Sequence, residues 1–208
     1  MDTEEFSADT EELATFSENL LSNDIMSQAL DSREFLYSSE GFLPISAINP
    51  IIWEAAGTDV MGIPDILDKG DRIISKVVMD AIMAWDPYAV VFLPAALKAD
   101  DGLAKERYLL SVNNIIDVMD EEESFVFMKD LSDYDLPPEL RVRRLFIDAE
   151  KYHVIPEHKK HIFRVKGSDD TIFFSMELVK HVWDIAMKAD CQGIVYTPFD
   201  FDEEAPIM

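Results

Sequence analysis

Apolar residues recur at helical spacing in two separate stretches of the chain. In residues 72–85 and again in residues 175–189 they fall every three or four positions, as on the buried face of an amphipathic helix. Asp86-Pro87 follows the first stretch and disfavours further helix. Ser175 stands where the second stretch needs an N-cap. We expect both helices to pack on a sheet through Val78, Ile82, Val182 and Trp183.

Short runs of β-branched and aromatic residues around these helices predict strands. Two of them, 161–166 and 171–174, are joined by a polar, glycine-containing segment that suits a hairpin. Others lie at 89–93, 106–116, 124–128, 142–148 and 194–196. Helices and strands in this order predict one α+β domain over residues 35–208, with a mixed, largely antiparallel sheet packed by a few helices.

The first 34 residues differ in character from this domain. Residues 1–32 hold nine acidic residues and no Lys or Arg, which is the opposite of a signal-peptide start. Leu13, Phe16, Leu20 and Leu21 fall on one helical face, so we expect an acidic N-terminal segment of short helices at 1–34, partly packed or partly mobile. No apolar run approaches the ~20 residues of a membrane span. We therefore expect a cytoplasmic protein without a membrane partner.

Residues 71–94 align without gaps on residues 175–198. Seven of the 24 aligned positions are identical, including Asp80/Asp184, Met83/Met187 and Asp86/Asp190. Any two helix–strand units share such a pattern, and this explanation is the simpler one. A true repeat would predict two similar units in one mixed sheet.

Charge narrows the classes of partner. The chain has 42 acidic and 18 basic residues, for a formal net charge of −24. This field repels nucleic acids and anionic membranes, and it attracts cationic proteins. Eight of the basic residues are concentrated in residues 141–166, where we expect them to pair with the acidic segments of the same chain.

The sequence predicts no enzyme. It contains seven glycines, and no phosphate-binding glycine loop, nucleophile elbow or dinucleotide fingerprint. Cys191 is the single cysteine and is read as a packing residue. His153, His158, His161 and His181 have no further ligand at a matching spacing, so no metal site is expected. We predict no catalytic residue, no cofactor and no metal.

Several strand and turn segments form a recognisable series between about residues 71 and 200. They include Arg-Tyr-Leu-Leu-Ser-Val-Asn at 107–113, Leu-Phe-Ile-Asp at 145–148 and Ile-Phe-Phe-Ser at 172–175. Further segments of the series lie at 116–120, 162–165 and 193–196, and Ser124 also belongs to it. In order and spacing, the series resembles a family of bacterial immunity proteins from polymorphic toxin systems. The resemblance implies a protein that binds and neutralises a toxin encoded beside it, and it carries over no catalytic residue.

Together, the resemblance and the net charge predict a basic cognate toxin or effector as the partner. The densest exposed carboxylates are expected in one turn and in the C-terminal tail. These candidate partner-binding residues are Asp117, Asp120, Glu121, Glu122 and Glu123 in the turn, and Asp200, Asp202, Glu203 and Glu204 in the tail. Two alternatives are an acidic chaperone or adaptor for a secreted protein, and a small enzyme of unrecognised class. The oligomeric state stays open.

Overall fold

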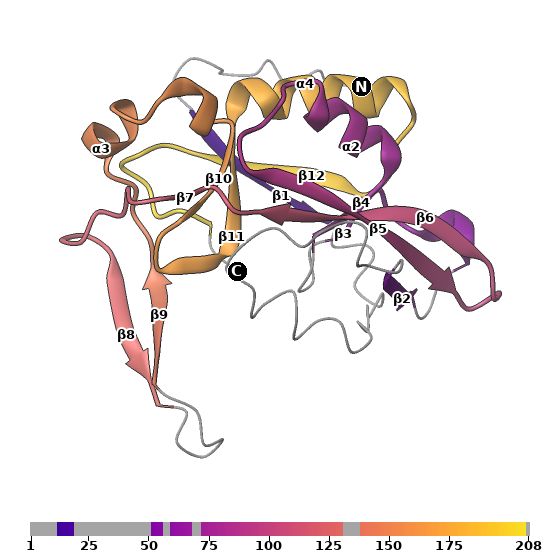
Figure 1. Cartoon of the computed structure of the whole chain (residues 1–208), viewed down its shortest axis with the longest axis horizontal. Coiled ribbons are helices and arrows are strands. Elements are labelled where there is room, and N and C mark those ends of the chain that lie inside the picture. Colours follow the sequence, from indigo (N-terminus) through magenta and orange to yellow (C-terminus); the bar gives the residue numbers. More distant parts are fainter. Residues whose placement is uncertain (1–11, 19–50, 56–58, 68–71, 131–137, 207–208) are drawn as a thin grey trace, which may run out of the picture.

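The strands form two larger sheets and a separate two-stranded ribbon. The computed structural model describes residues 12–18, 51–55, 59–67, 72–130 and 138–206, which adopt the α+β fold predicted from the sequence (Figure 1). The first sheet has the order β12-β1-β11-β10-β7, with bounds Ile194–Phe199, Leu13–Glu18, Ser168–Ser175, Ile162–Val165 and Ile115–Ile116. The second has the order β2-β5-β6-β4-β3, with bounds Ile51–Ala55, Val90–Ala99, Ala104–Val112, Ile73–Ile74 and Ile66–Leu67. The ribbon pairs β8 (Phe125–Lys129) with β9 (Glu139–Arg144).

Antiparallel pairing dominates both larger sheets, as expected. Parallel pairing joins β7 to β10 in the first and β2 to β5 in the second. Among the described residues, the helices are α2 (Lys76–Met83), α3 (Ala149–His153) and α4 (Met176–Lys188), with short 3-10 turns at Val60–Gly62 and Glu157–Lys159.

Each larger sheet contains one strand–helix–strand unit of the same design. In the first sheet, α4 connects β11 to β12, and the antiparallel strand β1 lies between them. In the second, α2 connects β4 to β5, and the antiparallel strand β6 lies between them. Both units are therefore split β-α-β motifs, in which the helix joins two parallel strands across an inserted one. They occupy different sheets, and not the one mixed sheet that a repeat was expected to form.

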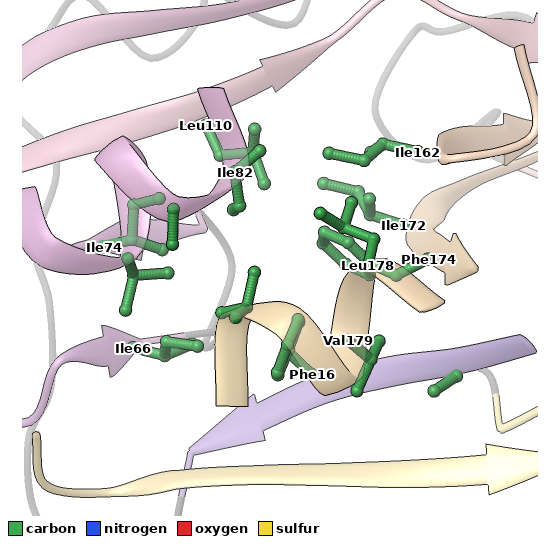
Figure 2. Packing of buried hydrophobic residues seen from close by; sticks show 14 of the residues in the cluster. Phe16, Ile66, Ile74, Ile82, Leu110, Ile162, Ile172, Phe174, Leu178 and Val179 are labelled. Atoms are coloured by element: carbon green, nitrogen blue, oxygen red, sulfur yellow. The ribbon is translucent and has the colours of Figure 1, made fainter. Parts of the chain in front are cut away.

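The two helices share one hydrophobic core with the sheets. Val78 and Ile82 of α2 and Val182 of α4 are buried, and Trp183 packs against them, which confirms the predicted contact residues. Figure 2 shows side chains from α2, α4 and the strands pointing toward one another, among them Ile82, Leu178 and Phe174.

The opposite face of the first sheet carries a second core. Side chains alternate across a strand, so Phe174 faces the helices while its neighbour Phe173 faces away. Phe173 packs with Phe163 and Phe199, and with Leu145 and Ile147 from the segment that follows β9. This second core supports the acidic turn and the C-terminal tail.

Two predicted helices are corrected by the structure. Leu13–Glu18 form strand β1 where the sequence predicts helix, because residues 13–16 are all buried between β11 and β12. Residues 1–11 and 19–34, and the domain boundary expected after residue 34, lie outside the described residues. The helix expected over 72–85 begins only at Lys76, because Ile73–Ile74 pair with β6 as strand β4.

Some predicted strands shift along the chain. The strand expected at 142–148 is β9, which ends at Arg144, and only Ile147 makes a further isolated bridge, to Met119. The strand expected at 89–93 runs on to Ala99 through Pro94. Pro94 has no N–H to donate, and it lies just before the part of β5 that pairs with β2. The hairpin is confirmed, with Lys166-Gly167 as its turn.

Candidate functional site

The predicted acidic turn lies between β7 and β8 and is organised by one of its own carboxylates. Asp120 Oδ1 accepts hydrogen bonds from the backbone N–H groups of Glu122 at 2.9 Å and Glu123 at 3.1 Å. This side chain therefore holds the turn in shape. Glu121, Glu122 and Glu123 are exposed, so three successive carboxyl groups stand in solvent.

Asp117, at the start of this turn, already has a basic partner. Its Oδ2 lies 2.7 Å from Nζ of Lys166, which occupies the turn between β10 and β11. The hydrogen bond lowers the pKa of Asp117 and raises the pKa of Lys166. Both side chains are exposed, so the pair holds Asp117 in place without removing it from water.

The predicted tail is anchored to the body. Ala205 is buried, and its N–H donates to the carbonyl of Leu145 at 2.8 Å. The Glu204 carboxylate accepts a hydrogen bond from Nε of Arg144 at 3.0 Å. Within the tail, Glu203 N–H donates to the Asp200 carbonyl at 3.1 Å. Asp202 and Glu203 remain exposed, so the tail displays its carboxylates at a fixed place on the surface.

One short segment brings the two acidic groups together. The turn binds this segment at Phe146, whose carbonyl accepts from Asp120 N–H at 3.0 Å and whose N–H donates to Ser124 Oγ at 2.9 Å. The tail binds the preceding residue, Leu145. Residues about 80 positions apart in the chain thus attach to neighbouring positions of one segment. We refer to the carboxylates of the turn and the tail together as the acidic end.

Basic residues of 141–166 pair with acidic ones, as expected. Besides Lys166–Asp117 and Arg144–Glu204, Lys160 lies 3.3 Å from Glu157, and Lys151 lies 3.7 Å from Asp148. The first two pairs tie the predicted turn and tail to the basic strip. They leave Glu121, Glu122, Glu123, Asp202 and Glu203 as the exposed carboxylates of the acidic end for which no cationic partner is seen among the described residues.

The β8–β9 ribbon adjoins the acidic end. β8 begins just after the turn, and β9 ends at Arg144, where the segment begins. The ribbon projects away from the two larger sheets (Figure 1). All five residues of β8 are exposed, including Phe125 at 50% and Met128 at 59%. The sequence predicts this strand but not its exposure, because Phe-Val-Phe-Met is equally typical of a buried strand.

Each of the four histidines lies against an aromatic ring. His153 packs on Phe201 and His158 on Tyr88, whereas His161 and His181 both pack on Trp85. Among the described residues, no group of three or more His, Cys, Asp or Glu side chains is placed to hold a metal.

Cys191 is half-buried, and burial is the main cause that raises the pKa of its thiol. Burial thus disfavours the thiolate that a cysteine nucleophile needs. At the acidic end, by contrast, exposed carboxylates stand beside an exposed apolar ribbon.

Comparison with known proteins identifies the family of the chain. A model of the immunity protein family Imm11 matches residues 63–200, which is more than half of the chain. The matched range contains both split β-α-β units except strand β1. It ends at residue 200, before most of the C-terminal tail. No curated protein matches the sequence. None of the helices in the described part of the chain combines the length and apolar character needed to cross a membrane.

Proposed function

This chain belongs to the immunity protein family Imm11, and from that membership we propose that it binds a cognate bacterial toxin in the cytoplasm and neutralises it. The partner is a folded toxin with a basic surface. The acidic end occludes this surface and keeps substrate away from it. The chain acts by binding, without catalysis, cofactor or metal.

The observation that carries the proposal is the convergence of the two acidic groups on residues 145–146. A net charge of −24 attracts a cationic partner from a distance. The turn glutamates, with Asp202 and Glu203 of the tail, are exposed carboxylates on two segments that bind neighbouring residues, Phe146 and Leu145, and they offer their charge to a basic cleft of the partner. Complementary charge of this kind speeds encounter and selects the partner.

Co-expression tests this function directly. The toxin encoded beside the gene of this chain is induced in a sensitive bacterial host, alone or with the full-length chain, and growth is followed. Growth arrest by the toxin alone and growth with both proteins are expected. Continued arrest in cells that contain the soluble chain would contradict the proposal.

The same host separates an immunity protein from the chaperone or adaptor alternative. An immunity protein inhibits purified, folded toxin at a one-to-one molar ratio. A chaperone for a secreted protein binds its client before folding or during export, and leaves the activity of folded toxin unchanged.

A further inference from the structure

The β8–β9 ribbon carries the longest consecutive run of exposed large apolar side chains among the described residues. Phe125, Val126, Phe127 and Met128 are exposed at 50%, 43%, 41% and 59%. They are consecutive and belong to a two-stranded sheet that pairs with no other strand of the described chain. A two-stranded ribbon is marginally stable by itself, and contiguous exposed apolar side chains usually mark a surface that a partner covers.

Apolar side chains stand on both faces of this ribbon. Because side chains alternate along a strand, Phe125 and Phe127 share one face, and their rings stack with centroids 6.3 Å apart. Val126 and Met128 share the other face. Aromatic side chains are enriched at protein interfaces, where a few buried anchors dominate the binding energy.

The charge of the ribbon differs in sign from the rest of the molecule. Lys129, Arg141, Arg143 and Arg144 stand on its two strands against Glu139 alone. Arg144 is paired with Glu204, whereas Arg143 is exposed at the β-bulge opposite Phe125 and Val126. The ribbon thus presents apolar anchors with a cationic margin, next to the anionic acidic end.

We infer that the β8–β9 ribbon inserts Phe125 and Phe127 into an apolar groove of the cognate toxin, whose rim carries carboxylates toward Arg143 and basic groups toward the acidic end. This inference rests on the proposed function and names the chemistry of the toxin surface. The acidic end steers the encounter, and the ribbon supplies the affinity and holds the complex together.

The charge pattern favours a toxin over a second copy of this chain. A symmetric dimer through the ribbon brings each surface against its own copy. It would bring two chains of net charge −24 together, with the acidic end of each beside the contact. A toxin whose groove is bordered by both acidic and basic groups places carboxylates against the arginines of the ribbon and basic groups against the acidic end.

Two double variants of the full-length chain test the aromatic anchors. Phe125→Ser with Phe127→Ser removes the stacked rings, and Met61→Ser with Leu103→Ser is the matched control, since those side chains are exposed at 75% and 57% elsewhere. Binding to the purified toxin encoded beside the gene is followed by surface plasmon resonance. The ribbon variant is expected to bind at least about 30-fold more weakly, mainly through faster dissociation, and the control to stay within about twofold.

Equal toxin affinity of the ribbon variant and the wild-type chain would overturn the inference. The proposed function would still stand if the wild-type chain rescues growth in the co-expression test. If the wild-type chain neither binds nor neutralises the toxin, both fail. Equal melting temperatures show that the variants are folded. Hydrogen exchange of the wild-type chain is a second readout: toxin is expected to protect the amides of residues 126–128, and unchanged exchange there in the complex would overturn the inference.

Two further experiments distinguish the proposed toxin groove from other binding partners of the ribbon. Arg143→Glu is expected to weaken toxin binding at low salt, whereas a uniformly basic toxin surface would bind this variant more tightly and would contradict the mixed rim. Sedimentation of the chain alone is expected to give a monomer. A wild-type dimer that the ribbon variant converts to monomer would assign the ribbon to self-association and overturn the inference.

Discussion

Lys166 holds Asp117 in an ion pair of 2.7 Å, so a carboxylate that the sequence offers for partner binding is already engaged within the chain. The pair links the β10–β11 turn to the start of the acidic turn. The Lys166 backbone reinforces this link, since its N–H donates to the Ile116 carbonyl at 2.9 Å. Asp117 therefore holds the turn in place. The carboxylates of Glu121, Glu122 and Glu123, which follow it, are better placed to meet a partner because they are exposed.

Asp117→Asn is expected to lower the melting temperature slightly at neutral pH, because exposed ion pairs contribute little. The pKa of Asp117 is lowered in the folded state, so its stabilisation is present above the ordinary carboxyl range and is lost as the pH falls through the lowered value. The wild-type chain and the variant should thus differ near pH 7 and converge near about pH 2. Calorimetric melting temperatures across this range check the prediction; a constant difference down to the lowest pH would contradict it.

The N-cap serines of the two helices are expected to respond in opposite ways. Ser175 Oγ accepts a hydrogen bond from Leu178 N–H at the start of α4, so Ser175→Ala should lower the free energy of unfolding by about 1 kcal/mol. Ser75 precedes α2 without a side-chain cap, and its buried Oγ has no hydrogen-bond partner in the structure. Ser75→Ala should therefore be neutral or stabilise by up to about 1 kcal/mol. Urea denaturation measures both, and a loss at Ser75 as large as that at Ser175 would refute this account.

Two equivalent turn positions make a second matched pair. Gly193 has φ +68, and a Cβ there would lie 2.5 Å from Pro64 Cβ, so Gly193→Ala should destabilise by at least about 2 kcal/mol. Ala89 occupies the same place before β5 with φ 54. Ala89→Gly should relieve this backbone strain and leave stability unchanged or raised by up to about 1 kcal/mol. Thermal unfolding of the two variants decides: similar losses at both positions would show that the turns are not equivalent.

The turn equivalence extends the alignment of residues 71–94 with 175–198. Asp86 and Asp190 both have positive φ, and each donates its N–H to the carbonyl of an aligned methionine, Met83 or Met187. The strands that follow begin at the aligned residues Val90 and Ile194. Because a helix commonly ends at a left-handed residue, matched left-handed backbone is also expected of two generic helix–strand units. The two units thus share their turn geometry and lie in different sheets.

Local signals predicted the elements that depend on near neighbours. The apolar spacing and Ser175 located α4, and the polar turn located the β10–β11 hairpin. Leu13–Glu18 were predicted wrongly, because their strand is defined by β11 and β12, more than 150 residues away. A central strand buried on both faces has no alternating pattern to distinguish it from a short helix.

The candidate site shows the same division. Charge density located the turn and the tail, yet their contact through Leu145 and Phe146 is a tertiary feature that spacing cannot reveal. The internal use of Asp120 as a turn cap also depends on geometry. The exposure of β8 was missed because an apolar strand gives one pattern whether the body of the protein or a partner covers it.

Stopped-flow association with the purified toxin tests the central claim, neutralisation through the acidic end, most directly. The test variant replaces five exposed carboxyl groups by amides, at Glu121, Glu122, Glu123, Asp202 and Glu203, and the control replaces Asp59, Asp100 and Asp101 near the β5–β6 turn. At low salt the test variant is expected to associate at least about tenfold more slowly than the control, and the difference should vanish near 1 M salt, where the screening length is about 3 Å. Association of the test variant at the wild-type rate in low salt would contradict the account.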